Sequence, residues 1–186
     1  MQQAIDKYIS EHSLGAFRPK AVLFDMDGVL YDSMPNHAVA WQKSMEQFDI
    51  HMTADDAYAT EGARGVDTIK KMVKAQQHRD IGEEEAQRMY DVKTSIFHEM
   101  PVAQIFDGVK ELMQKIKDCG MKIGVVTGSG QRPLIARLIN DFGDFITEER
   151  IVTAYDVKNG KPAPDPYLMG MQKVGTKPWW RMLHSA

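Results

Sequence analysis

The sequence holds a single cysteine, Cys119, among its 186 residues. One thiol excludes an internal disulfide and a zinc site built from several cysteines, and this usage is typical of a reducing compartment. The chain also lacks any apolar run near the roughly 18 residues that a membrane-spanning helix needs. Its first residues lack the apolar core of a secretory signal. We therefore expect a cytoplasmic protein without a membrane partner.

A strong excess of one charge is missing as well. The net charge is -3 and the isoelectric point is near 6.1, so no electrostatic attraction to nucleic acid or to an anionic surface is expected. Internal repeats and low-complexity segments are absent. Hydrophobic residues make up 43% of the chain, which at this length supports one main core and one subsidiary unit. A small metabolite is the partner that these features favour.

Two short apolar runs are typical of strands covered on both faces, as in parallel sheets. They span residues 21–24 and 121–126, and a polar loop containing glycine follows each. Between them, apolar residues recur at helical spacing over residues 37–48, 54–60, 65–76 and 82–100. After residue 107 the pattern alternates, predicting helices over residues 109–119, 133–140 and 166–174 and strands over residues 122–126 and 149–153.

This alternation predicts an α/β fold with a doubly wound, Rossmann-like parallel sheet into which an all-α helical unit is inserted. The predicted parts are a helical extension over residues 1–17, an α/β core over residues 18–35 and 105–186, and a helical insert over residues 36–104. In such a sheet, ligands bind beyond the carboxyl ends of the strands. The loops after Phe24 and Val126 are therefore the expected site.

Three carboxylates, Asp25, Asp27 and Asp32, follow the first apolar run within eight positions. Ionised aspartates at one strand end repel each other unless a cation lies between them, and Mg²⁺ prefers such oxygen ligands together with substrate phosphate. Aspartates at strand ends also form turns and helix caps, which is the role we expect for Asp32. Capping needs one acid, so the pair Asp25 and Asp27 predicts a metal site.

The stretch from Asp25 to Ser33, DMDGVLYDS, resembles the first motif of the haloacid dehalogenase-like phosphotransferases, DxDGxLxDS. The resemblance implies that Asp25 is the nucleophile that takes the phosphoryl group as an aspartyl-phosphate. It implies that Asp27 protonates the leaving oxygen and then activates water, with a pKa near the working pH. Mg²⁺ would be held by Asp25 and by the main-chain carbonyl of Asp27.

Two further stretches resemble motifs of the same family. Residues 125–129, with Thr127, Gly128 and Ser129, resemble the second motif, in which a hydroxyl and main-chain amides hold the phosphate. Residues 161–167, KPAPDPY, resemble the third, in which Lys161 neutralises the phosphate and the nucleophile. Taken alone, the first is also typical of a glycine-rich turn, and a single lysine is usually a solvated surface residue. The order and spacing of all three motifs favour the functional interpretation.

Residues 36–104 lie where the family places a helical cap, which closes over the site and selects the substrate. His37 and Trp41 resemble the HxxxW pattern of the β-phosphoglucomutase-like branch, although a pair one helical turn apart is also explained by packing. Glu61 and Gly65 stand where the mutase has a lysine and an arginine for a second phosphate. This difference favours hydrolysis over mutase action, with Arg64 one place away as a substitute.

The family's fourth motif, an apolar strand ending in acids, does not follow Val174. We therefore expect the last core strands to be missing and the strand over residues 21–24 to have an unpaired edge. The codons of residues 179–186 can be chosen so that reading two nucleotides further on gives Val-Glu-Asp-Ala-Pro-Leu-Gly, which resembles that motif. We hypothesise a frameshift, which sequencing the DNA beyond Pro178 tests. A natural divergent end, with Trp179 and Trp180 packed on the core, is the alternative.

These features together predict a Mg²⁺-dependent phosphohydrolase that acts on a small phosphorylated metabolite such as a sugar phosphate. A mutase that interconverts hexose phosphates is the alternative within the same family. An inactive fragment, or a domain that binds phosphorylated ligands without turnover, is the alternative outside enzymes.

Overall fold

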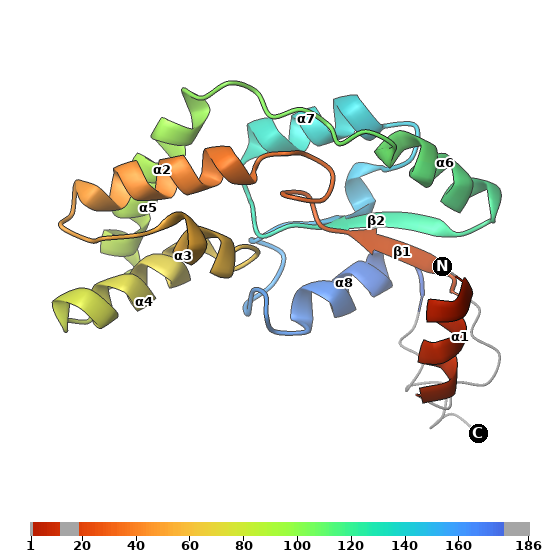
Figure 1. Ribbon diagram of the computed structural model, residues 1–186, viewed down its shortest axis with the longest axis horizontal. Coiled ribbons are helices and arrows are strands. Elements are labelled where there is room, and N and C mark those ends of the chain that lie inside the picture. The colour runs from red at the N-terminus through yellow and green to blue at the C-terminus, as the bar shows by residue number, and fades with distance from the viewer. Residues whose placement is uncertain (1, 12–18, 177–186) are drawn as a thin grey trace.

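The computed structural model describes residues 2–11 and 19–176 (Figure 1). Its sheet has three parallel strands, β1 (Ala21–Phe24), β2 (Lys122–Val126) and β3 (Ile151–Val152), in the spatial order β1-β2-β3. The predicted α/β fold with a parallel sheet is therefore confirmed. The tail from residue 177 onward, including the tryptophan pair and the stretch with the hypothesised frameshift, lies outside the described residues.

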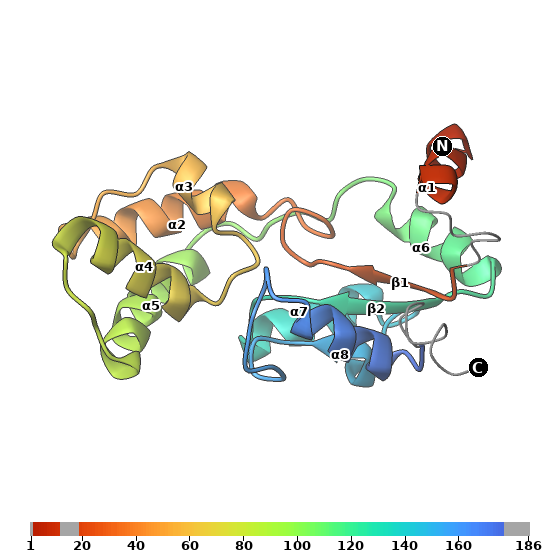
Figure 2. The same cartoon turned by 90° about the horizontal axis from the view of Figure 1, so that it is seen from below.

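Helices cover both faces of this sheet (Figures 1 and 2). The helices α6 (Val109–Asp118) and α7 (Arg132–Phe142) lie on one face, and α8 (Asp165–Lys173) lies on the other. Burial on both faces explains the continuous apolar run of β2, from Ile123 to Val126, which is wholly buried. A further helix, α1 (Gln2–Glu11), precedes the sheet.

The third strand is shorter than predicted. Of the predicted strand over residues 149–153, Glu149 and Arg150 belong to a 3-10 helix, η1 (Glu148–Arg150), and only Ile151 and Val152 pair with β2. The physical reason is that two acids and an arginine cannot enter a strand buried on both faces, whereas the two apolar residues after them are fully buried.

Four helices form the inserted unit between β1 and α6. They are α2 (Met34–Glu46), α3 (Ala54–Ala59), α4 (Gly65–Gln77) and α5 (Glu83–His98). Their apolar faces build a second hydrophobic cluster, separate from the cluster under the sheet. The helix α2 begins three residues before the predicted start, because Pro35 is well accommodated in a first helical turn. No described helix is long and apolar enough to cross a membrane.

Two linkers join the insert to the sheet, and they are hydrogen-bonded to each other. Asp32 N–H donates to the Gln104 carbonyl at 2.8 Å, and Phe106 N–H donates to the Leu30 carbonyl at 3.1 Å. Asp32 thus lies in this paired linker rather than at a helix cap, and the N-cap residue of α2 is Ser33.

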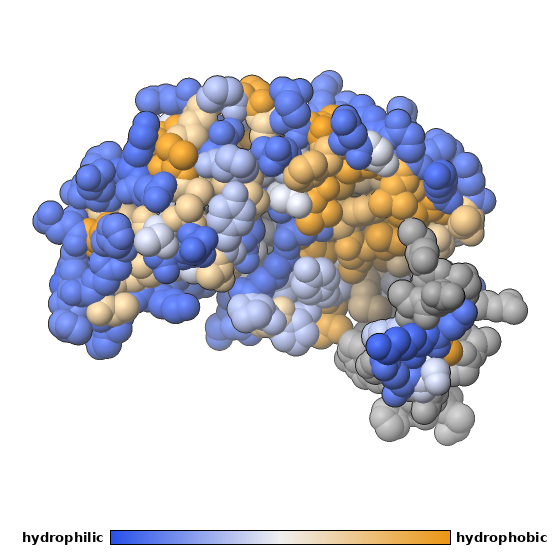
Figure 3. Space-filling view, in the orientation of Figure 1, coloured by the Kyte–Doolittle hydropathy of each residue, from blue (hydrophilic) through white to orange (hydrophobic). Residues whose placement is uncertain are grey.

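Among the described residues, β1 pairs with β2 on one side only. Apolar surface gathers over the region of β1 and α6 in the space-filling view (Figure 3). This arrangement matches the expected unpaired edge of the first strand within the part of the chain that the structure describes.

Candidate active site

Asp25 follows β1 directly and is held by a cation from a distant loop. Its Oδ2 atom lies 2.7 Å from Nζ of Lys161, and its Oδ1 atom accepts a hydrogen bond of 2.8 Å from the N–H of Met26. The Lys161 side chain is only 10% exposed and packs against Gly62 of the helical insert. The structure therefore brings the first and third motifs together at the carboxyl end of the sheet.

Asp27, two residues further on, faces the helical insert and is buried. Ser33 Oγ donates to its Oδ1 atom at 2.6 Å, and Nε2 of His37 lies 3.2 Å from the same oxygen. Burial pushes the pKa of Asp27 upward, but the hydrogen bonds and charges of these neighbours outweigh burial and hold the pKa below its usual value. The expectation of a pKa near the working pH was therefore wrong for this arrangement.

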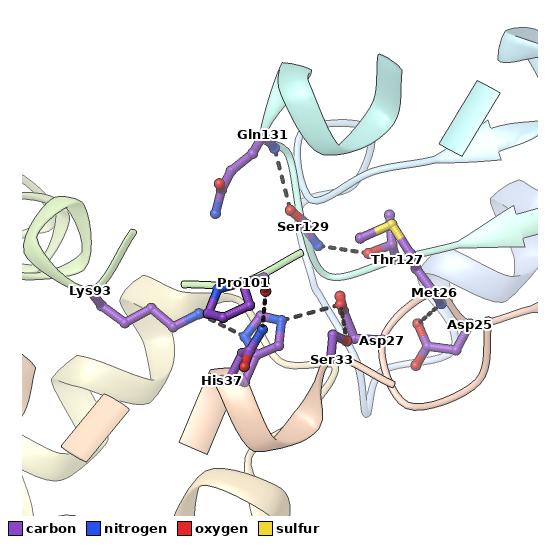
Figure 4. Close-up of polar contacts among 11 residues, drawn as sticks. Asp25, Met26, Asp27, Ser33, His37, Lys93, Pro101, Thr127, Ser129 and Gln131 are labelled. Carbon is purple, nitrogen blue, oxygen red and sulfur yellow. Dashed lines mark hydrogen bonds and ion pairs between the residues drawn. The ribbon is translucent and has the colours of Figure 1, made fainter. Parts of the chain in front are cut away.

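Behind His37 lies a buried lysine from α5, Lys93, whose Nζ atom is 2.8 Å from His37 Nδ1. An ammonium group can only donate, so Nδ1 accepts and the ring carries its proton on Nε2, toward Asp27. These three side chains form a continuous polar chain from the insert to the sheet (Figure 4). His37 thus does more than pack at the junction, and the chain links two parts of the fold.

Three aromatic rings surround the Lys93 ammonium, with centroids 4.9 to 5.8 Å from Nζ. They belong to Trp41, Tyr90 and Phe97. Burial lowers the pKa of Lys93 to about 8, although the charges of Glu61 and Asp27 oppose that effect. Trp41 is therefore part of the site as a neighbour of Lys93.

Sequence reasoning missed Lys93 and the contact that Ser33 makes with Asp27. A signal for Lys93 existed, because it stands four residues from Met89 and four from Phe97, on the buried stripe of its helix. A lysine on an apolar stripe is an exception that points to a buried partner.

Protein side chains also compensate the charges of the two neighbouring acids. Asp25 has Lys161, and Asp27 has His37 with Lys93 behind it. The predicted repulsion between the two acids is therefore relieved by protein cations.

The donor set for Mg²⁺ is partial in the described chain. No cluster of three or more histidine, cysteine or acidic side chains that could hold a metal occurs among the described residues. Mg²⁺ commonly takes one or two carboxylates and completes its shell with water and substrate phosphate. Asp25 fits as one such ligand.

The loop after β2 meets the helical insert at very close range. Ser129 N–H donates to Thr127 Oγ1 at 3.0 Å, which fixes the turn. A Cβ atom on Gly128 would lie 2.7 Å from the Gly62 carbonyl oxygen, so only glycine permits this approach. The insert is therefore closed onto the sheet at this loop.

A small cavity of about 30 Å³ lies between the insert and the sheet. Its lining residues are Asp27, His37, Trp41, Thr60, Glu61, Ala63, Gly65, Tyr90, Lys93, Gly128 and Ser129. Pockets for small metabolites are commonly ten times larger or more, so this cavity is too small to hold a substrate in the described arrangement. Burial raises the pKa of Glu61, the one acid besides Asp27 in this lining, while the charge of His37 opposes the shift.

Arg64, considered from the sequence as a substitute for the phosphate-binding cation of the mutase, forms ion pairs within the insert. Its guanidinium lies 3.1 Å from Glu83 and 3.9 Å from Asp67, and its stem packs on Gly160. It is not among the residues that line the small cavity. Of the other predicted residues, Asp27, His37, Trp41, Gly128 and Ser129 line the cavity, Lys161 contacts Asp25, and Thr127 is joined to the cavity through Ser129.

Comparison with known proteins gives the family. The model of the haloacid dehalogenase-like hydrolases matches residues 22–179. A phosphorylated carbohydrates phosphatase from Thermotoga maritima is 28% identical over 160 residues, covering 86% of this chain and 72% of that protein. Hexitol phosphatase A from Escherichia coli is 29% identical over 161 residues, with coverage of 87% and 71%.

Solved structures agree with these matches. One from Bacteroides vulgatus, which carries a provisional β-phosphoglucomutase name, is 43% identical with a TM-score of 0.86 and covers 95% of this chain and 71% of its own. A β-phosphoglucomutase from Clostridium difficile, 23% identical with a TM-score of 0.70 and coverage of 86% and 72%, shares the fold. With the family model matched over most of its length, the chain belongs to the haloacid dehalogenase-like hydrolases.

Proposed function

We propose that this protein is a Mg²⁺-dependent phosphohydrolase that cleaves a small phosphorylated carbohydrate through an aspartyl-phosphate on Asp25. The observation that carries the proposal is the pairing of Asp25 Oδ2 with Lys161 Nζ at 2.7 Å. The neighbouring acid, Asp27, contacts His37 of the helical insert. Two relatives are phosphatases whose names specify phosphorylated carbohydrates and hexitols, which supports this substrate class.

In the first step, a carboxylate oxygen of Asp25 forms a bond to phosphorus while the bond from phosphorus to the leaving oxygen breaks. Asp27 gives the leaving oxygen its proton. In the second step, Asp27 takes a proton from water, the water oxygen attacks phosphorus, and the bond to Asp25 breaks. Lys161 offsets negative charge on both the nucleophile and the phosphoryl group, and the Thr127 hydroxyl with the loop amides positions that group.

Magnesium, when bound, would be held by the Asp25 carboxylate and the main-chain carbonyl of Asp27, and it would supply a positive charge for the transferring group. The residues described above perform the remaining tasks. They hold the nucleophile, carry the proton and exclude water.

The polar chain supplies the proton that the first step needs. Hydrogen bonds from His37 and Ser33 favour ionised Asp27, which suits the second step. For the first step, the Nε2 proton of His37 moves to Asp27 while a proton of the Lys93 ammonium moves to Nδ1. This transfer leaves a neutral Lys93 amine, which its lowered pKa of about 8 makes accessible.

The insert acts as a cap in this proposal, with residues 36–104 as its extent. His37 and Lys93 belong to it, so the proton chain is complete only when the cap is closed. Cap opening then admits substrate, and closing excludes water from the aspartyl-phosphate.

Hydrolysis is favoured over mutase action by the lining of the small cavity. Lys93 is the only lysine or arginine in that lining, and it already faces His37. Glu61 adds an acid, which repels a second phosphate group. A mutase that works through a bisphosphate needs cationic side chains there.

The proposal is tested by measuring phosphate release from a panel of sugar phosphates, with and without Mg²⁺. We expect turnover by the wild-type chain that needs Mg²⁺, that Asp25→Asn abolishes and that the exposed control Asp144→Asn leaves unchanged. Equal release by Asp25→Asn and wild type would refute the nucleophile. Binding of inorganic phosphate in calorimetry without any turnover would instead support a ligand-binding domain, and conversion between hexose phosphates would support the mutase.

A further inference from the structure

An arginine outside the small cavity, Arg137 on α7, joins three parts of the molecule. Its Nε atom lies 3.2 Å from Asp141 Oδ2, one turn along the same helix. Its guanidinium carbon lies 4.3 Å from the centroid of the Tyr31 ring, and one of its terminal nitrogens donates to the Ala103 carbonyl. Tyr31 belongs to the loop that carries Asp27, and Ala103 belongs to the linker that returns from the cap.

Tyr31 closes the loop that holds both catalytic acids. Its N–H donates to the Met26 carbonyl, and its carbonyl accepts from Gly28 N–H at 2.9 Å. The Tyr31 hydroxyl donates to Asp141 at 2.9 Å, and its ring is buried beneath the guanidinium. Arg137 and Asp141 therefore anchor the catalytic loop to α7.

The second attachment leads back into the cap. Beyond Ala103 on the same linker, the Pro101 carbonyl accepts a hydrogen bond of 2.8 Å from the side chain of Asn36. Asn36 lies in the first turn of α2, immediately before His37. The position of the linker, which Arg137 contacts at Ala103, thus affects the position of His37, the histidine that contacts Asp27.

Packing alone does not hold the linker in this place. A cavity of about 190 Å³ lies beside it, between α7 and the catalytic loop, with Met26, Pro101, Val102, Leu134 and Arg137 among its lining residues. Next to such a space, directional polar contacts have to fix the geometry, because side chains that touch on one side only resist displacement weakly.

We propose that Arg137 is a positioning residue that sets the cap's return linker against the catalytic loop, and so places His37 for its contact with Asp27. This inference rests on the proposed function. A planar guanidinium suits the task, because it can lie flat on a ring while its donors point in fixed, divergent directions, whereas an ammonium group is neither planar nor held in one donor geometry.

The test compares Arg137→Met and Arg137→Lys with wild type on two substrates. One is the sugar phosphate that the wild type cleaves fastest, whose leaving group needs a proton, and the other is p-nitrophenyl phosphate, whose leaving group needs none. We expect kcat for the sugar phosphate to fall at least about 10-fold in both variants, since small misplacements of a catalytic group cost up to about 100-fold. Hydrolysis of p-nitrophenyl phosphate should fall less than about threefold. The control Lys117→Met removes a comparable ring and carbonyl contact on α6, far from the linkers, and should change neither rate.

Equal losses on both substrates, or wild-type rates in Arg137→Lys, would overturn the proposal. Amide hydrogen exchange supplies a readout that does not need turnover. Exchange at Asp32 and Phe106, whose N–H groups join the two linkers, should accelerate at least about 10-fold in Arg137→Met and not in Lys117→Met. If the wild type cleaves no phosphate ester, the proposed function fails. Unchanged exchange at these two amides in Arg137→Met would then by itself refute the positioning role of Arg137.

Discussion

The Nζ atom of Lys93 lies 2.8 Å from Nδ1 of His37, although 56 positions separate the two residues in the chain. His37 in turn lies 3.2 Å from Asp27 across the boundary between cap and sheet. A buried ammonium group on α5 therefore connects the cap to the proposed acid and base of the reaction.

Replacing Lys93 by methionine removes the proton source while keeping an unbranched side chain among the three rings. We expect kcat for a sugar phosphate to fall about 100-fold, the usual scale for a lost general acid. The exposed Lys74→Met on α4 is the matched control and should keep wild-type rates. Steady-state kinetics on the two variants measure this effect. An unchanged kcat in Lys93→Met would exclude Lys93 as the source of the proton.

The pH dependence of the rate should carry the signature of Lys93. Above about pH 8 the buried lysine loses its proton, so the wild-type kcat should decline on the alkaline side. The Lys93→Met variant should lack this decline, because the titrating amine is gone from the polar chain. Rate profiles between pH 6 and pH 10 test this, and an identical alkaline decline in both proteins would assign it to another group.

The same lysine makes stability depend on pH with a defined sign. Its pKa is about 8 in the folded protein and 10.5 as an ordinary value, so between these values the unfolded chain binds more protons. The free energy of unfolding therefore rises with pH across this window. Relative to Lys93→Met, the wild type should gain up to about 3 kcal/mol. Urea titrations of both proteins at pH 7.5 and pH 10.5 measure this gain. A wild type that loses stability relative to Lys93→Met over this range would contradict a lowered pKa of Lys93.

Gly128 should tolerate no side chain, for a reason that lies in the cap. A Cβ atom there would meet the Gly62 carbonyl at 2.7 Å, and a backbone carbonyl cannot move aside cheaply. We expect Gly128→Ala to lower kcat/KM about 10-fold or more by preventing cap closure. In the control Gly160→Ala, the nearest atom is Cγ of the flexible Arg64 at 2.9 Å, and a change below about twofold is expected. Equal effects would argue against a tight closed state.

Glu61 should lower the activity on substrates that carry two phosphate groups. Exchanging it for lysine reverses the charge in the small cavity, whereas Glu61→Gln keeps the shape and removes the charge. The ratio of activity on a sugar bisphosphate to that on the monophosphate should rise in both variants, most in Glu61→Lys and about 10-fold there. A ratio that stays at the wild-type value would remove Glu61 from substrate selection.

The fold, and the position of Asp25 at the end of the first strand, could be predicted from the sequence because both depend on local patterns. Continuous apolar runs marked β1 and β2, and helical spacing marked the insert. The third strand was predicted too long, because burial rather than sequence position decides that η1 leaves the sheet. The apolar run also placed Asp25 at a strand end, whereas Lys161, which contacts it, was expected there only from the resemblance to the third motif.

The rest of the site depends on tertiary contacts that no local pattern encodes. The lowered pKa of Asp27 arises from His37 and Ser33 together, and sequence reasoning predicted the opposite direction. Lys93 and Arg137 reach their partners across 56 and 34 positions. Their roles follow from how the cap and its linkers lie on the sheet, which requires coordinates.

Trapping the covalent intermediate tests the central claim most directly. The wild-type chain is mixed with Mg²⁺ and its best sugar phosphate, quenched in acid within the first turnover, and digested for mass spectrometry. We predict one added phosphoryl group on the peptide that contains Asp25, and none in Asp25→Asn. Turnover without any phosphorylated Asp25, or the same modification in Asp25→Asn, would contradict the account.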